Sequence, residues 1–334
     1  MKKLVITFLL GSFLFSIANG QVAGQENCRV TAVQWVSSTI ECSDEPYKLV
    51  FYDEFDGNTL DESKWYSYYP FGENKSDQCE YCRTHGEEGQ IYEDDNVVLE
   101  NGVLNLITEE DNTTWYNANR DYTSGMIYSK NHFLYGKFEI RCKVPAGTGF
   151  WPAFWLWNLD ECDVFEICGH DTESLNTNLH MQCENNPQQI PQSHSTPDLS
   201  AGFHTYSVEW EPLYVIWKLD GETIRIFHRY RTVAGQTVTC GEYVPTSILF
   251  SEKIIPNEYM HVIANLALSV GDSYCKKDEV DETTPFPSTF EIDYIRVYQK
   301  EPQQGLIDLC AQGEINGPDE MRVYKKVCHS KTLT

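Results

Sequence analysis

The sequence has little positive charge. Only 25 Lys and Arg residues stand against 50 Asp and Glu among 334 residues, which gives a formal net charge of −25. A chain this acidic repels polyanions, so we expect neither nucleic acid nor an anionic membrane surface as a partner. Aromatic residues, by contrast, make up 13% of the chain, a content that excludes a disordered acidic polypeptide because such polypeptides lack core-forming side chains.

Long hydrophobic runs are also missing. The apolar stretch Leu4–Ile17 is shorter than the ~20 residues that a membrane-spanning helix needs. It follows Lys2 and Lys3 and precedes small residues at positions 18–20, which is the layout of a secretory signal peptide. We therefore predict a signal peptide over residues 1–20, no membrane span, and a secreted or periplasmic protein.

Secretion changes how the 12 cysteines are interpreted. An even number of cysteines in an oxidising compartment indicates disulfide bonds, whose pairing one sequence does not reveal. Cys79 and Cys82, with His85 nearby, can alternatively hold zinc, although no second pair of ligands with zinc spacing follows.

Sustained helical periodicity, internal repeats and low-complexity tracts are absent as well. Short alternating or aromatic runs recur instead, separated by turn signals such as Asn101-Gly102 and Asp220-Gly221. Many short strands joined by tight turns predict an all-β sandwich or barrel. The runs are Lys48–Tyr52, Asn96–Leu99, Val103–Thr108, Gly136–Val144, Trp151–Trp157, Thr205–Glu209, Val215–Leu219, Thr223–His228, Met260–Leu268 and Phe290–Tyr298.

Four acids lie within seven positions, in the run D-E-C-D-V-F-E over residues 160–166. Alternate side chains of a strand share a face, so Glu161 and Asp163 point one way, while Cys162 and Val164 point into the opposite layer. Glu166 has the wrong parity for the acidic face, and one extra residue, a β-bulge, returns it there. A solvated acidic edge would explain neither the interleaved apolar residues nor the aromatic run just upstream.

Three carboxylates in a row are costly unless they share protons, so at least one pKa should be raised. Hydrolysis of a glycoside uses such a pair: one carboxylate attacks the sugar carbon while a protonated carboxyl assists the leaving oxygen. This pattern predicts a retaining mechanism through a covalent intermediate.

The motif Glu161-x-Asp163-x-x-Glu166 resembles the E-x-D-x-x-E pattern of glycoside hydrolase family 16. Further similar motifs are spread over residues 48–299: the segment 49–57, Gln90-x-Tyr92, the run W-P-A-F-W at 151–155, N-L-A at 265–267 and the segment 292–298. The resemblance implies a two-sheet antiparallel β-jelly-roll sandwich with a concave glycan cleft. It divides the chain into the signal peptide, an extension over 21–47, a catalytic domain over 48–299 and a Cys-containing tail over 300–334.

The resemblance also implies roles for residues. Glu161 is expected as the nucleophile, Glu166 as the general acid and base, and Asp163 as the residue that orients the pair. Trp151 and Trp155 are expected to stack on sugars, with core packing as the alternative for each. His180 is expected to hydrogen-bond in the cleft, with a structural histidine as the alternative. Catalysis needs no cofactor, and a structural Ca²⁺ is implied at three positions, Asp293, Gly102 and Glu54.

The sequence departs from the family pattern at several positions. Met126 stands where laminarin-cleaving relatives usually have Arg, and Cys162 and Cys168 are unusual around the acids. The missing Arg removes one expected contact with the substrate. From the resemblance as a whole we predict a monomeric, endo-acting hydrolase of a β-1,3- or mixed-linked β-glucan. The alternatives are the same chemistry on an agar- or carrageenan-type galactan, and a glycan-recognition protein without catalysis.

Overall fold

A computed structural model describes residues 46–300 apart from short gaps at 87, 182–187, 212–213, 229–230, 233–242, 245–246, 251–254, 257, 272–273 and 276–278. It also describes the backbone of two short strands, β1 (Val33–Trp35) and β2 (Ser38–Thr39). The predicted signal peptide, most of the predicted extension and the predicted tail from residue 301 lie outside the described residues. Within the described part, no helix is long and apolar enough to cross a bilayer.

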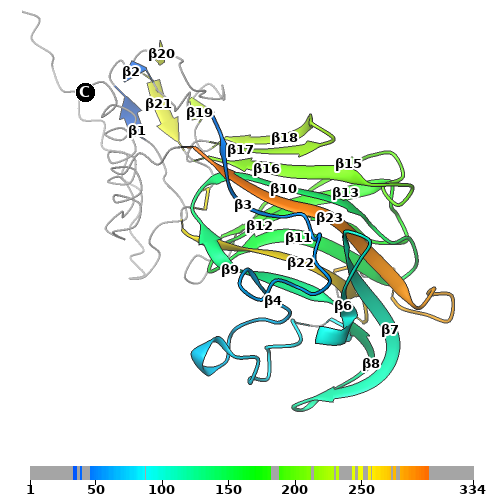
Figure 1. Cartoon of the computed structure of the whole chain (residues 1–334). Helices are drawn as coiled ribbons and strands as arrows, with labels where there is room; N and C mark the ends of the chain where they lie inside the picture. Colours follow the sequence, from blue (N-terminus) through cyan, green and yellow to red (C-terminus); the bar gives the residue numbers. More distant parts are fainter. Residues whose placement is uncertain are drawn as a thin grey trace, which may run out of the picture.

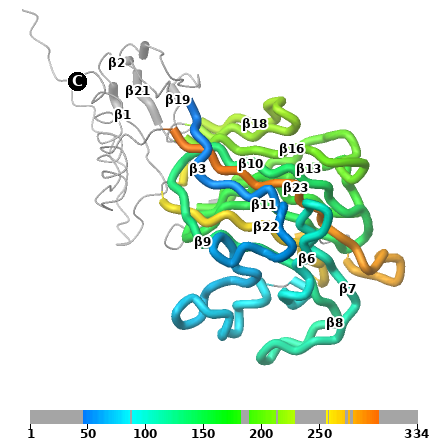
Figure 2. The backbone as a smooth tube through the Cα atoms, in the orientation of Figure 1, coloured from blue at the N-terminus to red at the C-terminus, as the bar shows by residue number. Residues whose placement is uncertain are grey.

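The larger sheet has ten strands in the order β18-β17-β16-β10-β23-β7-β8-β5, with β3 beside β23 and β6 beside β7. The strands of this sheet that come first and last along the chain, β3 and β23, lie side by side, as the blue and orange strands show in Figures 1 and 2. Its strands are β3 (Lys48–Asp53), β5 (Gln90–Tyr92), β6 (Val97–Glu100), β7 (Val103–Trp115), β8 (Ala118–Ser124), β10 (Gly136–Lys143), β16 (His204–Trp210), β17 (Tyr214–Leu219), β18 (Glu222–His228) and β23 (Ser288–Gln299).

The second sheet carries the acidic run. Its eight strands follow the order β14-β13-β12-β11-β22-β9-β4, with β15 beside β13. They are β4 (Trp65–Tyr66), β9 (Met126–Phe133), β11 (Phe150–Trp157), β12 (Glu161–Glu166), β13 (Ser174–Met181), β14 (Gln188–Gln189), β15 (Gln192–Ser195) and β22 (Met260–Leu268).

The remaining elements are short. Two small sheets join β1 to β21 and β19, and β2 to β20. In the part of the chain that the structure describes, two 3-10 turns are the only helical elements. The bounds are β19 (Arg231–Thr232), β20 (Tyr243–Val244), β21 (Ser247–Phe250), η1 (Glu73–Lys75) and η2 (Asp94–Asn96).

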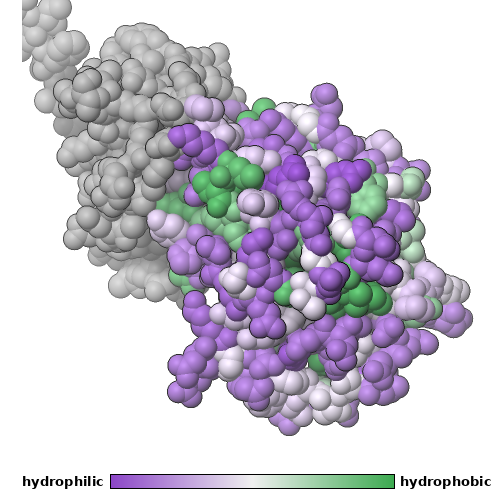
Figure 3. All heavy atoms as spheres, viewed as in Figure 1, coloured by the Kyte–Doolittle hydropathy of each residue, from purple (hydrophilic) through white to green (hydrophobic). Residues whose placement is uncertain are grey.

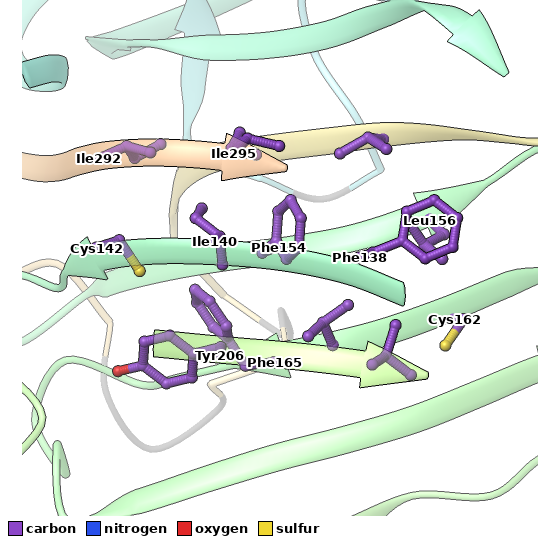
Figure 4. Close-up of a cluster of buried hydrophobic side chains, with 14 of the residues drawn as sticks. Phe138, Ile140, Cys142, Phe154, Leu156, Cys162, Phe165, Tyr206, Ile292 and Ile295 are labelled. Carbon is purple, nitrogen blue, oxygen red and sulfur yellow. The ribbon is translucent and has the colours of Figure 1, made fainter. Parts of the chain in front are cut away.

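The two large sheets pack face to face over one hydrophobic core. Side chains from β10, β11, β12, β16 and β23 meet there, as Figure 4 shows. Phe165 of β12 lies 4.4 Å from the ring of Tyr206 and 6.2 Å from that of Phe290, measured between ring centroids. Because aromatic rings bury large apolar areas, these contacts fix β12 to the opposite sheet. The predicted two-sheet antiparallel sandwich is confirmed.

The outer surface agrees with the charge of the chain. The face in Figure 3 is mostly hydrophilic over the described residues, with scattered apolar patches. Exposed apolar side chains include Leu49, Val50 and Tyr52 at the start of β3. These three residues lie within four positions of one strand, so the exposed apolar area there is local.

Four of the described cysteines form two disulfide bonds, Cys79–Cys82 and Cys168–Cys275. The zinc alternative at Cys79 and Cys82 is therefore wrong, because their sulfur atoms are bonded to each other. Cys142 and Cys162 are free, against the expectation of pairing. Both face the core between the sheets, where each acts as a small apolar side chain (Figure 4).

Candidate active site

The bulge expected in the acidic strand is present. Asp163 pairs with Trp155 on β11 and Asn178 on β13, whereas Glu166 pairs with Ala153 and Asn176. Three steps on β12 therefore oppose two steps on each neighbour, so one extra residue is inserted. Cys162, Val164 and Phe165 are buried in the core, which leaves Glu161, Asp163 and Glu166 for the other face of the sheet.

His180 connects two of the three acids. Its Nε2 atom lies 3.1 Å from Glu161 Oε1 and 3.0 Å from Asp163 Oδ2. Asn178 places its amide nitrogen 2.8 Å from the same Nε2 atom. The oxygen of that amide accepts hydrogen bonds from the backbone N–H groups of Leu179 and Ile190, which fixes the amide orientation. The amide nitrogen of Asn178 faces Nε2, so Asn178 helps to hold the imidazole ring between the two acids.

Burial raises the pKa of all three acids. It raises the pKa of Glu161 to about 8, and the charge of Asp163 adds to the effect. Burial raises the pKa of Asp163 to about 7, although a hydrogen bond with Glu161 and the nearby Arg225 oppose the rise. Burial also holds the pKa of Glu166 well above its ordinary range, with the charges of Asp163 and Glu161 adding to it. The cluster therefore holds protons at pH values where isolated carboxyl groups are ionised.

Two groups support Asp163 from behind the sheet. Trp217 Nε1 on β17 donates to the Asp163 backbone oxygen at 2.9 Å. Arg225 on β18 is buried, stacks on Trp217, and donates to Thr177 O at 2.9 Å. A buried guanidinium with satisfied hydrogen bonds offsets part of the cost of burying acids nearby.

Trp151 lies beside Glu166. Its Nε1 atom donates to Glu166 Oε1 at 3.2 Å. The Trp151 ring is half-buried and stacks on the ring of Tyr274 at 5.2 Å between centroids, with an interplanar angle of 19°. The structure therefore places the sequence-predicted Trp151 next to one of the three acids.

Trp155 has a different environment. Its side chain is only 7% exposed and belongs to a second cluster with Tyr69, Tyr92, Met126, Tyr128, Ala153 and Ile263. Its Nε1 atom donates to Asn265 Oδ1 at 2.8 Å, and Asn265 in turn donates to the Tyr92 hydroxyl at 2.9 Å. Trp155 therefore offers a sugar very little surface, and its position favours a supporting role.

The connection between β4 and β5, which carries the Cys79–Cys82 disulfide bond and is called the Cys79–Cys82 loop below, covers this second cluster. Tyr69 in the loop is completely buried, and His85 lies 5.9 Å from the Trp155 ring. Phe71 lies 5.3 Å from the ring of Trp157. The loop therefore covers the face of the second sheet on the side of Trp155 and Trp157.

The residues implied for calcium do not fit that ion. Both carboxylate oxygens of Glu54 accept hydrogen bonds from Arg296, at 2.7 Å each. Asp293 forms an ion pair with Arg141. Gly102 lies in a turn with a φ of +74°. Asp293 would supply the one carboxylate ligand, and the other two positions backbone oxygens. Because the Asp293 carboxylate is already paired with Arg141, the arrangement does not favour a calcium ion there, and no step below uses one.

A different group has metal-binding chemistry. Among the described residues, only Glu161, Asp163 and His180 bring three ligand atoms of the His, Cys, Asp and Glu type within 4.8 Å of one another. Two of these residues belong to the row of three acids on β12 (Glu161, Asp163 and Glu166), and His180 on β13 contacts both of them. The raised pKa values of Glu161 and Asp163 indicate that these two acids share protons.

Sequence reasoning missed several residues of the site. Asn178 lies in β13, Arg225 in β18 and Tyr274 in the connection after β22, and no spacing along the chain relates them to the acids. Asn265 belonged to a recognised motif, N-L-A at 265–267, but without a role. Pairing between β22 and β11 places Asn265 opposite Ala153, two residues from Trp155.

The fold and the site together define a class: β-sandwich proteins that carry a bulged, three-acid strand on one sheet. The family model of glycosyl hydrolases family 16 matches residues 86–252, which include all three acids. The chain belongs to this family.

Particular relatives are similar over most of the chain. The glucan endo-1,3-beta-glucosidase A1 of Niallia circulans is 28% identical over 277 residues, which cover 76% of this chain and 38% of that protein. The chain thus spans about two fifths of that relative's length. A beta-glucanase of Rhodothermus marinus is 28% identical over 271 residues, which cover 76% of this chain and 85% of that protein.

A solved structure shows the same fold. The catalytic domain of an endo-1,3-beta-glucanase (laminarinase) from Thermotoga petrophila RKU-1 superposes with a TM-score of 0.60 and 28% sequence identity. The match covers 77% of this chain and 100% of that chain.

Proposed function

We propose that this chain is an endo-acting, retaining glycoside hydrolase that cleaves a β-1,3- or mixed-linked β-glucan. The observation that carries the proposal is the bulged strand β12, which directs Glu161, Asp163 and Glu166 to one face of the sheet. The printed names of the relatives, glucan endo-1,3-beta-glucosidase and beta-glucanase, support the choice of polymer.

The three acids have different roles in this proposal. Glu161 attacks the anomeric carbon and forms the glycosyl–enzyme bond, while Glu166 donates a proton to the leaving oxygen. Glu166 then takes a proton from water, which attacks the same carbon and releases Glu161. Asp163 orients Glu161 and exchanges a proton with it, supported by the hydrogen bond between them and the contact of both with His180.

Azide rescue separates the two glutamates. Glu161→Gly and Glu166→Gly should each lose at least about a thousandfold in kcat on a β-glucan or an aryl β-glycoside. With an activated aryl glycoside, azide restores the turnover of Glu161→Gly, and the product is an α-glycosyl azide because azide replaces the nucleophile directly. Azide also restores the turnover of Glu166→Gly, and the product is then a β-glycosyl azide because azide attacks the glycosyl–enzyme. Glu62→Gln, at an exposed acid, is the matched control and keeps wild-type activity.

The products identify the mechanism and the polymer. NMR of fresh hydrolysate should show the β-anomer first, and an initial α-anomer would exclude the retaining mechanism. A substrate panel of laminarin, lichenan, agarose and carrageenan decides the linkage. Position 126, where laminarin-cleaving relatives usually have Arg, holds a Met that is completely buried in the second cluster. This position therefore offers the polymer no charged contact. Activity confined to the galactans, or binding without cleavage, would support the two alternatives.

We also propose that the protein is exported and acts as a monomer. The apolar run near the start of the chain and the two disulfide bonds support export, because such bonds persist in oxidising compartments. Fractionation of the producing cells and size-exclusion chromatography with light scattering test the two statements.

A further inference from the structure

Tyr274 is an aromatic residue near the acid Glu166, and the proposed mechanism gives Tyr274 no role. It lies in the connection between β22 and β23, beyond the residues 86–252 that the family model matches. Its ring stacks on Trp151, the residue that donates a hydrogen bond to Glu166, and the charge of Glu166 adds to the burial that raises the pKa of the Tyr274 hydroxyl. Tyr274 is nevertheless 41% exposed, so part of its ring faces solvent.

A disulfide bond holds Tyr274 in this place. Cys275, the next residue, is bonded to Cys168, which follows Glu166 by two positions. The two cysteines are 107 positions apart in sequence, so the bond ties a distant connection directly to the end of the acidic strand. Ser269 adds a second tie, because its hydroxyl donates to the Cys275 backbone oxygen at 3.2 Å.

The other end of the disulfide is equally constrained. Gly169 follows Cys168 and forms two backbone hydrogen bonds, donating to Phe150 O at 2.7 Å and accepting from Gly147 N at 2.9 Å. A Cβ atom at Gly169 would lie 2.4 Å from the Gly147 oxygen, so only glycine permits this close approach. The chain leaving the acidic strand is thus fixed at the residue that anchors the Tyr274 connection.

We propose that Tyr274, held by the Cys168–Cys275 disulfide, is the sugar-binding platform on the leaving-group side of the active site. The inference rests on the proposed function. Because Glu166 protonates the oxygen of the departing sugar, a ring that stacks on Trp151 beside Glu166 lies close to that sugar. A neutral glucosyl unit presents C–H groups that pack on an aromatic face. Tyr274 covers part of Trp151, so it takes over the stacking role predicted for Trp151.

The test compares substrates that do and do not use the leaving-group side. Tyr274→Ala should lower kcat/KM on the β-glucan polymer about tenfold, the scale of one lost aromatic contact and its buried area. On an oligosaccharide with a 2,4-dinitrophenyl leaving group it should change kcat/KM less than about twofold, because that group needs neither acid assistance nor a sugar platform. Transfer to a glucosyl acceptor should fall with the polymer activity. Tyr274→Phe keeps the ring and should restore the polymer activity.

The disulfide is tested in the same way. Cys168→Ser with Cys275→Ser should reproduce the selective loss on the polymer at a temperature where the variant is folded. Cys79→Ser with Cys82→Ser is the matched control and should not change the ratio of polymer to aryl-glycoside activity.

Two results would overturn the inference. One is a folded Tyr274→Ala protein with wild-type activity on the polymer, and the other is an equal loss on both substrates. Either leaves the proposed function intact, because the enzyme still cleaves the glucan through Glu161 and Glu166. A wild-type protein that cleaves no β-glucan would instead refute the proposed function itself.

Discussion

Replacing Glu161 by glutamine should stabilise the folded protein at pH 8 while abolishing turnover. Burial and Asp163 raise the pKa of Glu161 from 4.5 to about 8. Between these two pH values the unfolded chain has lost a proton that the folded protein still binds. Folding stability therefore falls as pH rises through this window, and it is unaffected by Glu161 below about pH 4. Glutamine is neutral at all these pH values, so the variant lacks this loss.

The magnitude follows from the same interval. At about 1.4 kcal/mol per pH unit, the step from 4.5 to about 8 sets a ceiling of about 5 kcal/mol. Glu161 shares its proton with Asp163, and its side chain keeps 24% exposure, so we expect less than half of the ceiling, about 2 kcal/mol. For a domain of this size, that is about 4–8 °C in Tm.

Calorimetry from pH 4 to pH 9 measures the effect. The Tm difference between Glu161→Gln and wild type should be near zero at pH 4 and grow to its full value by pH 8. Glu62→Gln, at an exposed acid, is the control and should follow wild type. A Tm difference that does not depend on pH would refute the reasoning, because it would assign the change to packing and not to a proton.

Two further predictions concern the supports of the site. Loss of Cys168–Cys275, which spans 107 positions, should lower the free energy of unfolding by about 4–5 kcal/mol, whereas loss of Cys79–Cys82, which spans 3, should lower it by about 1–2 kcal/mol. Urea titrations of the two serine double variants measure both values, and equal losses would contradict the loop-closure argument. Arg225→Met removes a charge that lowers the pKa of Asp163, so the acid limb of the pH profile of kcat/KM should move to higher pH. An unchanged acid limb in the folded variant would exclude this coupling.

Strands with a clear alternation could be predicted from the sequence. All ten runs proposed from turn signals and periodicity correspond to strands of the structure, among them β10, β16 and β22. The bulge in β12 was predictable too, because parity alone required an extra residue between Glu161 and Glu166. In both cases the information lies within a few neighbouring residues.

Three strands of seven or eight residues were not predicted, and each has a physical reason. Strand β9 is covered on both faces at its start, with Ile127 in the main core and Met126 and Tyr128 in the second cluster, so no alternation appears. In β13 every second residue from Leu175 to Met181 is buried, but Asn178 is buried as well, and polar Asn, Ser and Thr residues hide the pattern. Strand β8 alternates exposed and half-buried residues and lacks an apolar face over most of its length.

The surroundings of the acids could not be predicted. Tyr274, Arg225 and Asn178 reach the acidic row from connections and strands that are far apart in sequence. Which cysteines pair, and that Cys142 and Cys162 stay free, depends on the faces that their strands present. Such contacts arise only when the two sheets are placed against each other.

These surroundings make three similar acids different. Spacing along β12 predicts a row of equivalent carboxyl groups, yet double displacement needs one ionised and one protonated at the same pH. Glu161 is the most exposed of the pair that His180 contacts, with 24% of its side chain accessible against 4% for Asp163. Glu166 is buried, and burial together with the charges of Asp163 and Glu161 holds its pKa well above its ordinary range. In the proposed mechanism this raised pKa keeps Glu166 protonated, which is the form that donates a proton to the leaving oxygen.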